Sequence, residues 1–257
     1  MSTGIEWTEE TWNPVTGCTK VSSGCDHCYA ERITERFHGP GSFERVVLHP
    51  DRLDKPLRWR KPRRVFVNSM SDLFHDDVPD EFLCRVFDTM ALACRHTFQV
   101  LTKRHARMRS FVTRYLSGDF TDWSRGPLAN TVDQPPPNVW LGVSVEDRRW
   151  VGIRIPALRE TPAVVRFMSC EPLLGPLDRL DLDGIGWVIV GGESGAGARP
   201  MDPRWAVDIV RQCREAAVPV FVKQLGSRWG SGHHDISLFP PALQVREYPA
   251  ARPSVPA

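Results

Sequence analysis

The sequence predicts an α/β protein folded as a partly open (β/α) barrel of about six to seven parallel strands. Short β-branched runs alternate with amphipathic stretches over most of the 257 residues, as βαβ units do. Within several runs, every second residue becomes polar toward the C-terminal end. An open sheet covered on both faces should be apolar on both, so these residues favour a barrel with a cavity at its C-terminal mouth.

Seven short runs are the predicted strands. The first is weak, and the other six are rich in β-branched and aromatic residues. In chain order, the strands are expected within Ile5–Val15, Val65–Ser71, Phe98–Thr102, Val139–Val145, Val164–Ser169, Trp187–Val190 and Val220–Val222.

Four apolar stripes at helical spacing predict helices between the strands, and we expect each stripe to face the core. Pro79 and Pro203 suit a first helical turn, and Asp202 is placed to cap the last helix. The stripes are Tyr29, Ile33 and Phe37; Phe82, Val86 and Met90; Met108, Phe111, Val112 and Tyr115; and Ala206, Ile209, Val210 and Cys213.

The predicted barrel occupies residues 1–225, with a cysteine-rich loop near its N-terminus. Residues 117–138 are rich in Gly, Pro and Asp and are longer than an ordinary connection, so we expect a lid or an insertion there. Residues 226–257 are polar and proline-rich. We expect them to form a tail packed on the barrel, with a loose end from residue 250.

The charge balance and the apolar runs exclude several classes of protein. Lys plus Arg number 33 against 31 acids, so no electrostatic case exists for obligate nucleic-acid binding. No apolar run approaches the roughly 18 residues that cross a bilayer, and the first twelve residues do not read as a secretion leader. Three of the seven cysteines lie close together, which favours metal ligation in a reducing cytoplasm over disulfides.

The cysteine cluster is the strongest chemical signal in the sequence. Six residues separate Cys18 from Cys25, and two separate Cys25 from Cys28, where a predicted helix starts. Three soft thiolates point to zinc, copper(I) or an iron–sulfur cluster. The spacing favours a cluster with one open iron. It leaves open a structural zinc site with a fourth ligand from His27, His38 or His75.

Polar and glycine residues at the strand ends are the candidate binding and catalytic groups. The segment Gly191–Gly197 lets backbone amides approach a phosphate, ribose or carboxylate, or else forms a tight turn. Lys103 and Lys223 suit an anionic ligand, or else ion pairs with neighbouring glutamates. The predicted mouth residues are Asn68, Asp72, Lys103, Ser144, Glu146, Glu171, Gly191, Gly192, Glu193, Lys223 and Gln224.

Several longer motifs resemble a known family over nearly the whole chain. They are Trp12–Cys18 with the cysteines that follow, Val65–His75, Val139–Glu146, Glu171–Pro176, Trp187–Gly195, Lys223–Gln224 and Val245–Pro249. These segments are similar to the phage-type three-Cys-motif family, a group of uncharacterised proteins often classed as radical-SAM-like. The resemblance implies a radical-SAM-like barrel.

The same resemblance implies an enzyme and its cofactors. Cys18, Cys25 and Cys28 would hold a 4Fe-4S cluster whose open iron binds S-adenosylmethionine. Cleavage of S-adenosylmethionine would yield a radical that abstracts hydrogen from a substrate in the barrel mouth. On this hypothesis, the catalytic residues are Lys103, Glu146, Glu193 and Lys223, and the cofactor-binding residues are Asn68, Asp72, Ser144, Glu171, Gly191, Gly192 and Gln224.

The resemblance also suggests partners and a substrate class. We expect a three-Cys-motif partner protein and a reductant of the flavodoxin or ferredoxin type. Nucleic-acid or nucleotide modification or repair is the expected reaction class, by analogy only. The alternatives are a zinc-stabilised binding protein and a redox iron–sulfur protein that does not use S-adenosylmethionine.

Overall fold

The computed structural model describes residues 4–120 and 134–250, which form a curled parallel sheet with helices on its outer face. The sheet has seven strands in the order β1-β4-β5-β6-β7-β8-β9, and every pairing is parallel. They span Glu10–Trp12 (β1), Arg64–Val67 (β4), Thr97–Thr102 (β5), Val139–Ser144 (β6), Val165–Cys170 (β7), Trp187–Gly191 (β8) and Val220–Gln224 (β9). Val15–Thr16 (β2) and Val47–Leu48 (β3) form a separate antiparallel pair.

The strand order decides between the two architectures that fit the sequence pattern. A doubly wound sheet reverses its order at a switch point, whereas this sheet follows chain order from one edge to the other. Right-handed crossovers then place successive helices on the same face. The sheet curls into a half-barrel that stays open between β1 and β9, and this confirms the predicted fold class.

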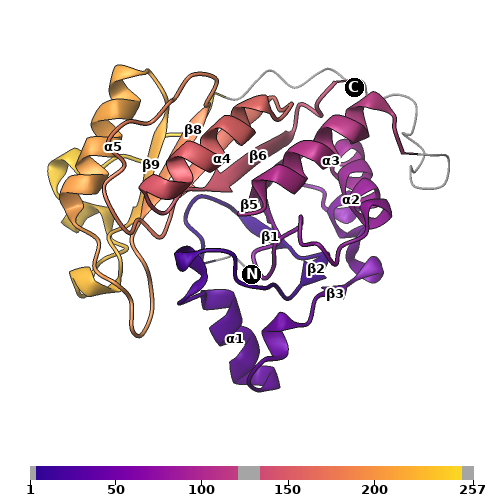
Figure 1. Cartoon of the computed structure of the whole chain (residues 1–257), viewed down its shortest axis with the longest axis horizontal. Coiled ribbons are helices and arrows are strands. Elements are labelled where there is room, and N and C mark those ends of the chain that lie inside the picture. The colour runs from indigo at the N-terminus through magenta and orange to yellow at the C-terminus, as the bar shows by residue number, and fades with distance from the viewer. Residues whose placement is uncertain (1–3, 121–133, 251–257) are drawn as a thin grey trace.

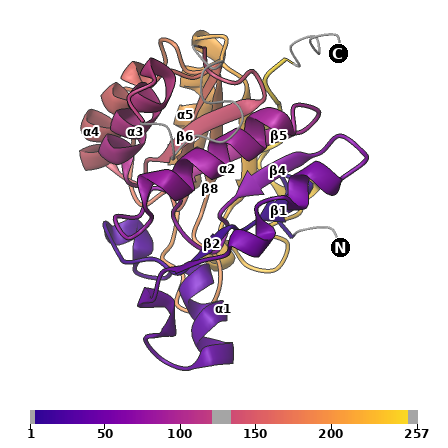
Figure 2. The same ribbon diagram turned by 90° about the vertical axis from the view of Figure 1, so that its right-hand side faces the viewer.

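Four helices cover the outer face of the curl (Figures 1 and 2). They span Asp80–Leu92 (α2), His105–Ser117 (α3), Arg148–Glu160 (α4) and Pro203–Glu215 (α5), and Asp202 caps α5 as predicted. Their buried apolar side chains share one core with the outward side chains of the strands. The stripes predicted this for α2, α3 and α5, whereas no stripe was predicted for α4. The short 3-10 helices are Ser23–Cys25, Ser42–Glu44, Pro50–Arg52, Lys55–Arg58, Ser227–Trp229, Ile236–Leu238 and Pro241–Leu243.

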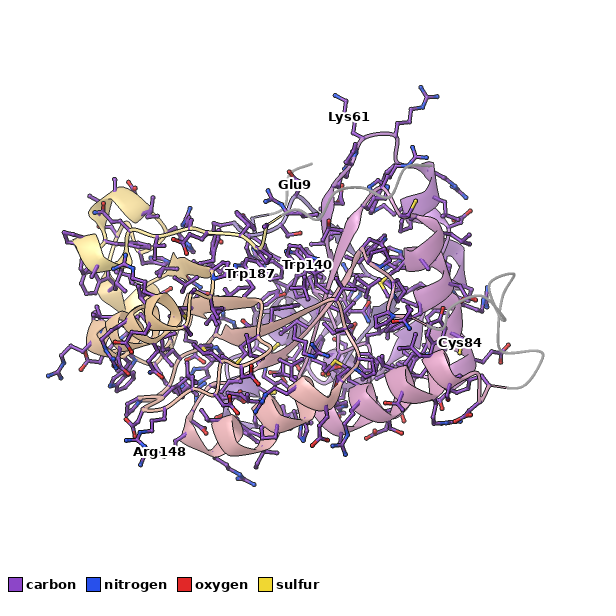
Figure 3. The ribbon with its side chains drawn as sticks, turned by 90° about the horizontal axis from the view of Figure 1, so that it is seen from above. Glu9, Lys61, Cys84, Trp140, Arg148 and Trp187 are labelled. Carbon is purple, nitrogen blue, oxygen red and sulfur yellow. The ribbon has the colours of Figure 1, made fainter. Side chains whose placement is uncertain are left out.

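The inner face of the sheet is filled by aromatic rings over its N-terminal half. Trp187 is fully buried there, and its ring centroid lies 5.8 Å from that of Trp140 and 5.7 Å from that of Phe167. Figure 3 shows Trp140 and Trp187 near the middle of the molecule, inside the curve of the sheet. Apart from the buried Gln99, which is paired with Phe66 and Trp140 in the sheet, the inner face is polar mainly toward the strand ends, above this aromatic floor.

The prediction for the first apolar stripe was wrong. The helix Tyr29–His38 (α1) forms as expected, but Ile33 is 46% exposed and Phe37 is 74% exposed. In both ribbon views, α1 extends away from the layers of the barrel (Figures 1 and 2). Helical spacing predicts a shared face but not whether another element covers it. Here Ile33 and Phe37 stay exposed, while the hydroxyl of Tyr29 donates to the carbonyl of Ser69.

Residues 226–250 lie against the open side of the curl. Trp187 donates from Nε1 to the carbonyl of Glu247 at 2.9 Å, and the ring of Tyr248 stacks on Trp187. The loose end predicted from residue 250 falls mostly on residues 251–257, outside the described residues, and most of the 117–138 insertion falls there too. The proposed domain limits therefore stay predictions. No helix in the described ranges is long and apolar enough to cross a bilayer.

Candidate functional site

A cavity of about 210 Å³ lies at the C-terminal ends of the strands. One side is the cysteine loop, defined here as residues 17–28. The opposite side is the strand-end wall, defined here as the inward side chains at or just beyond the ends of β4, β5, β6, β7 and β9. They are Asn68, Lys103, Ser144, Ser169, Glu171 and Lys223. Parallel strands bring their C-terminal ends to one rim, which is why residues far apart in the sequence meet here.

Most of the predicted site residues line this one cavity. They are Cys18, Cys25, Cys28, Asn68, Asp72, Lys103, Ser144, Glu171, Gly192, Glu193 and Lys223. Glu146, Gly191 and Gln224 are close by but do not line it. Their assigned roles, like those of the lining residues, stay predictions.

The three cysteines are free thiols, and each is half-buried. Burial, together with the nearby carboxylate of Asp72, raises the pKa of Cys18 to about 12, although Arg104 opposes this. Cys25 and Cys28 lie near enough to add to the same rise. A thiolate at Cys18 therefore needs a compensating positive charge, which a metal centre provides.

The donor set fits a cluster that takes three cysteine thiolates and keeps one position open. Within residues 4–120 and 134–250, no three Cys, His, Asp or Glu side chains converge on the position of one metal ion. A cubane cluster takes one thiolate on each of three irons, which the three cysteines of this loop supply. Three soft thiolates also suit a zinc ion with a fourth ligand, so the identity of the metal stays a prediction.

A buried ion pair anchors the first half of the cysteine loop. Arg154 of α4 donates to the carboxylate of Glu146 at 2.6 Å, and neither side chain is exposed. The hydroxyl of Ser22 donates to the other carboxylate oxygen of Glu146. At Gly24, a Cβ atom would lie 2.9 Å from that same oxygen, so glycine lets the loop approach. Glu146 thus contacts the loop instead of the cavity.

A second acid–arginine pair anchors the other half of the loop. Glu193 accepts from the backbone N–H of Arg199 at 2.8 Å and from its guanidinium, and its Oε2 lies 2.8 Å from Nδ1 of His27. Arg199 also donates to the carbonyl of Ser23 at 2.8 Å. Burial alone would raise the pKa of Glu193, but the hydrogen bonds from Arg199 and His27 lower it to about 2.

The glycine-rich segment after β8 contacts the chain itself at close range. Arg32 of α1 donates to the carbonyls of Ser194 and Ala196 at 2.8 and 3.1 Å. At Gly195, where φ is +98°, a Cβ atom would lie 2.1 Å from the Arg32 guanidinium. The segment turns against α1, and Gly192, Glu193 and Ser194 line the cavity, so both interpretations of this segment stay predictions.

The far end of the wall holds an ion pair. Lys223 donates to Oε1 of Glu171 at 2.7 Å, and Gln224 donates to the same oxygen at 3.1 Å. Lys223 was predicted either to bind an anion or to pair with a glutamate, and in this structure it pairs. Glu171 thereby has two donors before any ligand arrives.

Asp72 and Asn68 are held by the backbone at the other end of the wall. Asp72 accepts from the hydroxyl of Thr102 at 2.7 Å and from the backbone N–H groups of Phe74 and Lys103, each at 3.0 Å. Asn68 lines the cavity, and its φ of +61° is a left-handed backbone conformation that residues other than glycine rarely adopt. These contacts fix the segment after β4 against the end of β5.

Sequence reasoning missed several residues of the site. No local spacing indicates the residues that hold the loop. Ser22 and Arg199 act through contacts across more than 120 positions, and Arg154 acts from a helix on the outer face. Ser169 was detectable, because it is the inward residue beside Ser144 on the next predicted strand. Trp7 lies before β1, in a stretch where the sequence predicts only a weak strand and no periodic pattern indicates burial.

Comparison with known proteins yields a family and a broad likeness of fold. A family model described as "Protein of unknown function (DUF5131)" matches residues 2–244. No curated protein matches the chain.

Two solved structures of spore photoproduct lyase are similar in fold. The structure complexed with a dinucleoside spore photoproduct has 13% identity and a TM-score of 0.43, and the match covers 78% of this chain and 59% of that one. A mutant of the lyase has 14% identity and a TM-score of 0.47, with 83% and 64% covered. This chain thus matches less than two thirds of either structure's length, and no residue role is carried over from them.

Proposed function

Because the chain belongs to the DUF5131 family of proteins of unknown function, its activity has to be inferred from its own site, and we propose an iron–sulfur enzyme of the radical-SAM type. One observation carries the proposal. Three free thiols and a wall of polar side chains from successive parallel strands face the same cavity. Three soft ligands leave one position of a cluster open, and an open position beside a shaped pocket is the arrangement of a catalytic centre.

In this proposal, Cys18, Cys25 and Cys28 hold a 4Fe-4S cluster. When bound, the cluster supplies the electron that cleaves S-adenosylmethionine and so starts hydrogen abstraction from the substrate. The resemblance to the three-Cys-motif family supports both cofactors.

The chain's own residues supply placement and shielding. The two acid–arginine pairs fix the cysteine loop against α4 and the segment after β8. The strand-end wall binds and orients the substrate, and the aromatic floor closes the inner end of the cavity to water. Glu146 contributes by holding Ser22, which makes it a positioning residue in the proposal.

Nucleic acid or a nucleotide is the proposed substrate class. A flavodoxin- or ferredoxin-type reductant and a three-Cys-motif partner protein are the proposed partners. These three assignments follow the sequence resemblance.

The test is anaerobic reconstitution of the full chain with iron and sulfide. We expect about four irons and four sulfides per chain, as a cubane requires. Single Cys18→Ala, Cys25→Ala and Cys28→Ala variants should lose the cluster. Cys94→Ala is the matched control, since Cys94 is exposed and lies outside the site.

Addition of S-adenosylmethionine should change the cluster's EPR spectrum, and after reduction it should yield 5'-deoxyadenosine. Cluster assembly at parental levels in all three site variants would contradict the ligand assignment. One tightly bound zinc would favour a zinc-stabilised binding protein. A stable cluster whose EPR spectrum ignores S-adenosylmethionine would favour a redox protein.

A further inference from the structure

The charged side chains around the cavity are mostly paired with one another. Lys20 pairs with Glu31 at 3.0 Å, and Lys223 pairs with Glu171 at 2.7 Å. Within the described ranges, Lys103 and Arg104 are the cationic side chains of the lining that form no ion pair with a carboxylate. Two positive charges therefore lie in the cavity without a negative partner.

The two unpaired cations face different surroundings. Arg104 donates to the hydroxyl of Thr19 at 2.8 Å, so its positive charge lies beside Cys18 and acts on the cysteine loop. Lys103 extends from the end of β5 along the strand-end wall, where its ammonium group lies 3.3 Å from the hydroxyl of Ser144. Three ammonium hydrogens with a single neutral acceptor leave most of the donor capacity of Lys103 unused.

A second hydroxyl lies next to the first. Ser144 and Ser169 are paired across β6 and β7, so their side chains point to the same inner face at adjacent positions. Each residue is 1% exposed, and both line the cavity. In the part of the chain that the structure describes, the hydroxyl of Ser169 has no hydrogen-bond partner, so it is available to a ligand.

Four further buried donor atoms of the lining have no partner among the described residues. They are Nδ2 of Asn68 and Nε1 of Trp7, on residues that are each 2% exposed, and Nε and Nη1 of Arg104 beside the cysteine loop. Buried polar groups almost always find a partner in a native protein. The lysine ammonium, the two serine hydroxyls and these N–H groups can all donate, so the molecule that satisfies them must be rich in acceptors.

We propose that Lys103, Ser144 and Ser169 form a subsite for an oxyanion, the phosphate group of a nucleotide substrate. This inference rests on the proposed function, because it takes the bound nucleotide to be the enzyme's substrate. Trp7, Phe66 and Leu101 line the same cavity and offer apolar surface to the base. A lysine binds phosphate as a point charge with hydroxyls completing the contacts, whereas flat two-point recognition of a carboxylate favours arginine.

The carboxylate of S-adenosylmethionine offers similar chemistry, so the test has to separate the two sources. The full chain is titrated with each of the four deoxynucleoside 5'-monophosphates, with the matching nucleosides, and with S-adenosylmethionine. Each titration is done on metal-free protein and again after reconstitution with iron and sulfide. Lys103→Met removes the charge, and Lys103→Arg retains it.

Lys61→Met is the matched control, because Lys61 is exposed and projects from the periphery in Figure 3, outside the cavity lining. We expect at least one nucleotide to bind about tenfold or more tightly than its nucleoside. Lys103→Met should abolish that difference, while Lys103→Arg keeps part of it and Lys61→Met keeps all of it. Circular dichroism and thermal melting confirm that each variant is folded.

Equal affinity for every nucleotide and its nucleoside in the parent protein would overturn the inference. Loss of S-adenosylmethionine binding in Lys103→Met, with nucleotide binding intact, would also overturn it, because the lysine would then bind the cofactor. If reconstitution forms no cluster but nucleotide binding still depends on Lys103, the proposed function is rejected and this inference stands. If the cluster forms normally but nucleotide binding does not depend on Lys103, this inference is rejected and the proposed function stands.

Discussion

The cysteine loop and the strand-end wall face each other across one cavity, yet they are held in place by different forces. The wall continues a seven-stranded ladder that rests on buried aromatic rings. The loop contains no strand and depends mainly on a few side chains, those of Glu146 with Arg154 and Glu193 with Arg199. Changes below the wall should therefore act on global stability, whereas changes at the loop anchors should also act on the proposed cluster.

The largest effect is expected from the aromatic floor beneath the wall. Trp187→Ala removes a fully buried ring that packs against rings from β6 and β7, and it should lower the free energy of unfolding by about 3–5 kcal/mol. Urea denaturation measures this. Trp229→Ala, at a ring that is 42% exposed, should cost less than about 0.5 kcal/mol. Similar losses in both variants would contradict the view of the floor as the main support.

The next effect concerns the buried anchor of the loop. Arg154→Met leaves the carboxylate of Glu146 buried without its partner, which should cost on the order of 3 kcal/mol. The double variant Arg154→Met/Glu146→Gln should recover part of that loss, because no buried charge remains. Urea denaturation gives the stabilities, and iron content after reconstitution reports on the loop. Unchanged iron content in every folded variant would show that this anchor does not position the cysteines.

Two glycines with nearly the same φ allow the cost of backbone strain to be measured separately from the cost of a steric clash at the loop. Gly17 and Gly39 have φ of +87° and +88°, but only at Gly17 would a Cβ atom meet backbone, 2.0 Å from the carbonyl oxygen of Arg45. Gly39→Ala should cost about 1–2 kcal/mol from the left-handed conformation alone. Gly17→Ala should cost more and should weaken iron binding through the adjacent Cys18. Equal costs in thermal or urea unfolding would show that the backbone yields around residue 17.

The last prediction concerns the pH dependence of the second anchor. The pKa of Glu193 falls from about 4.5 to about 2 in the folded chain, so its carboxylate stabilises the fold above pH 4.5. That contribution should be lost as the pH falls from about 4.5 toward 2. Glu193→Gln should therefore flatten the stability profile in this window, as measured by urea denaturation at several pH values. An unchanged slope between pH 4.5 and 2 would show that Arg199 and His27 do not hold this charge in solution.

The fold could be predicted largely from the sequence because its signals are local. Strand runs and helical stripes follow from the preferences of neighbouring residues, and all seven predicted strands are present in the sheet. Most of the polar residues predicted at the strand ends line the cavity, since side chains of a strand alternate strictly between its two faces.

The partners of those side chains could not be predicted in the same way. Glu146 was expected in the cavity, but it contacts Ser22, which is 124 positions away, and His27 meets Glu193 across 166 positions. The apolar stripe of α1 was expected in the core and is exposed. The sequence by itself determined the elements, the inward faces and the cysteine cluster, since these depend on short-range periodicity and spacing. Only the tertiary structure decided which charges are paired, which stripe is left uncovered and which lysine stays unpaired, because those outcomes depend on elements that the curl of the sheet brings together.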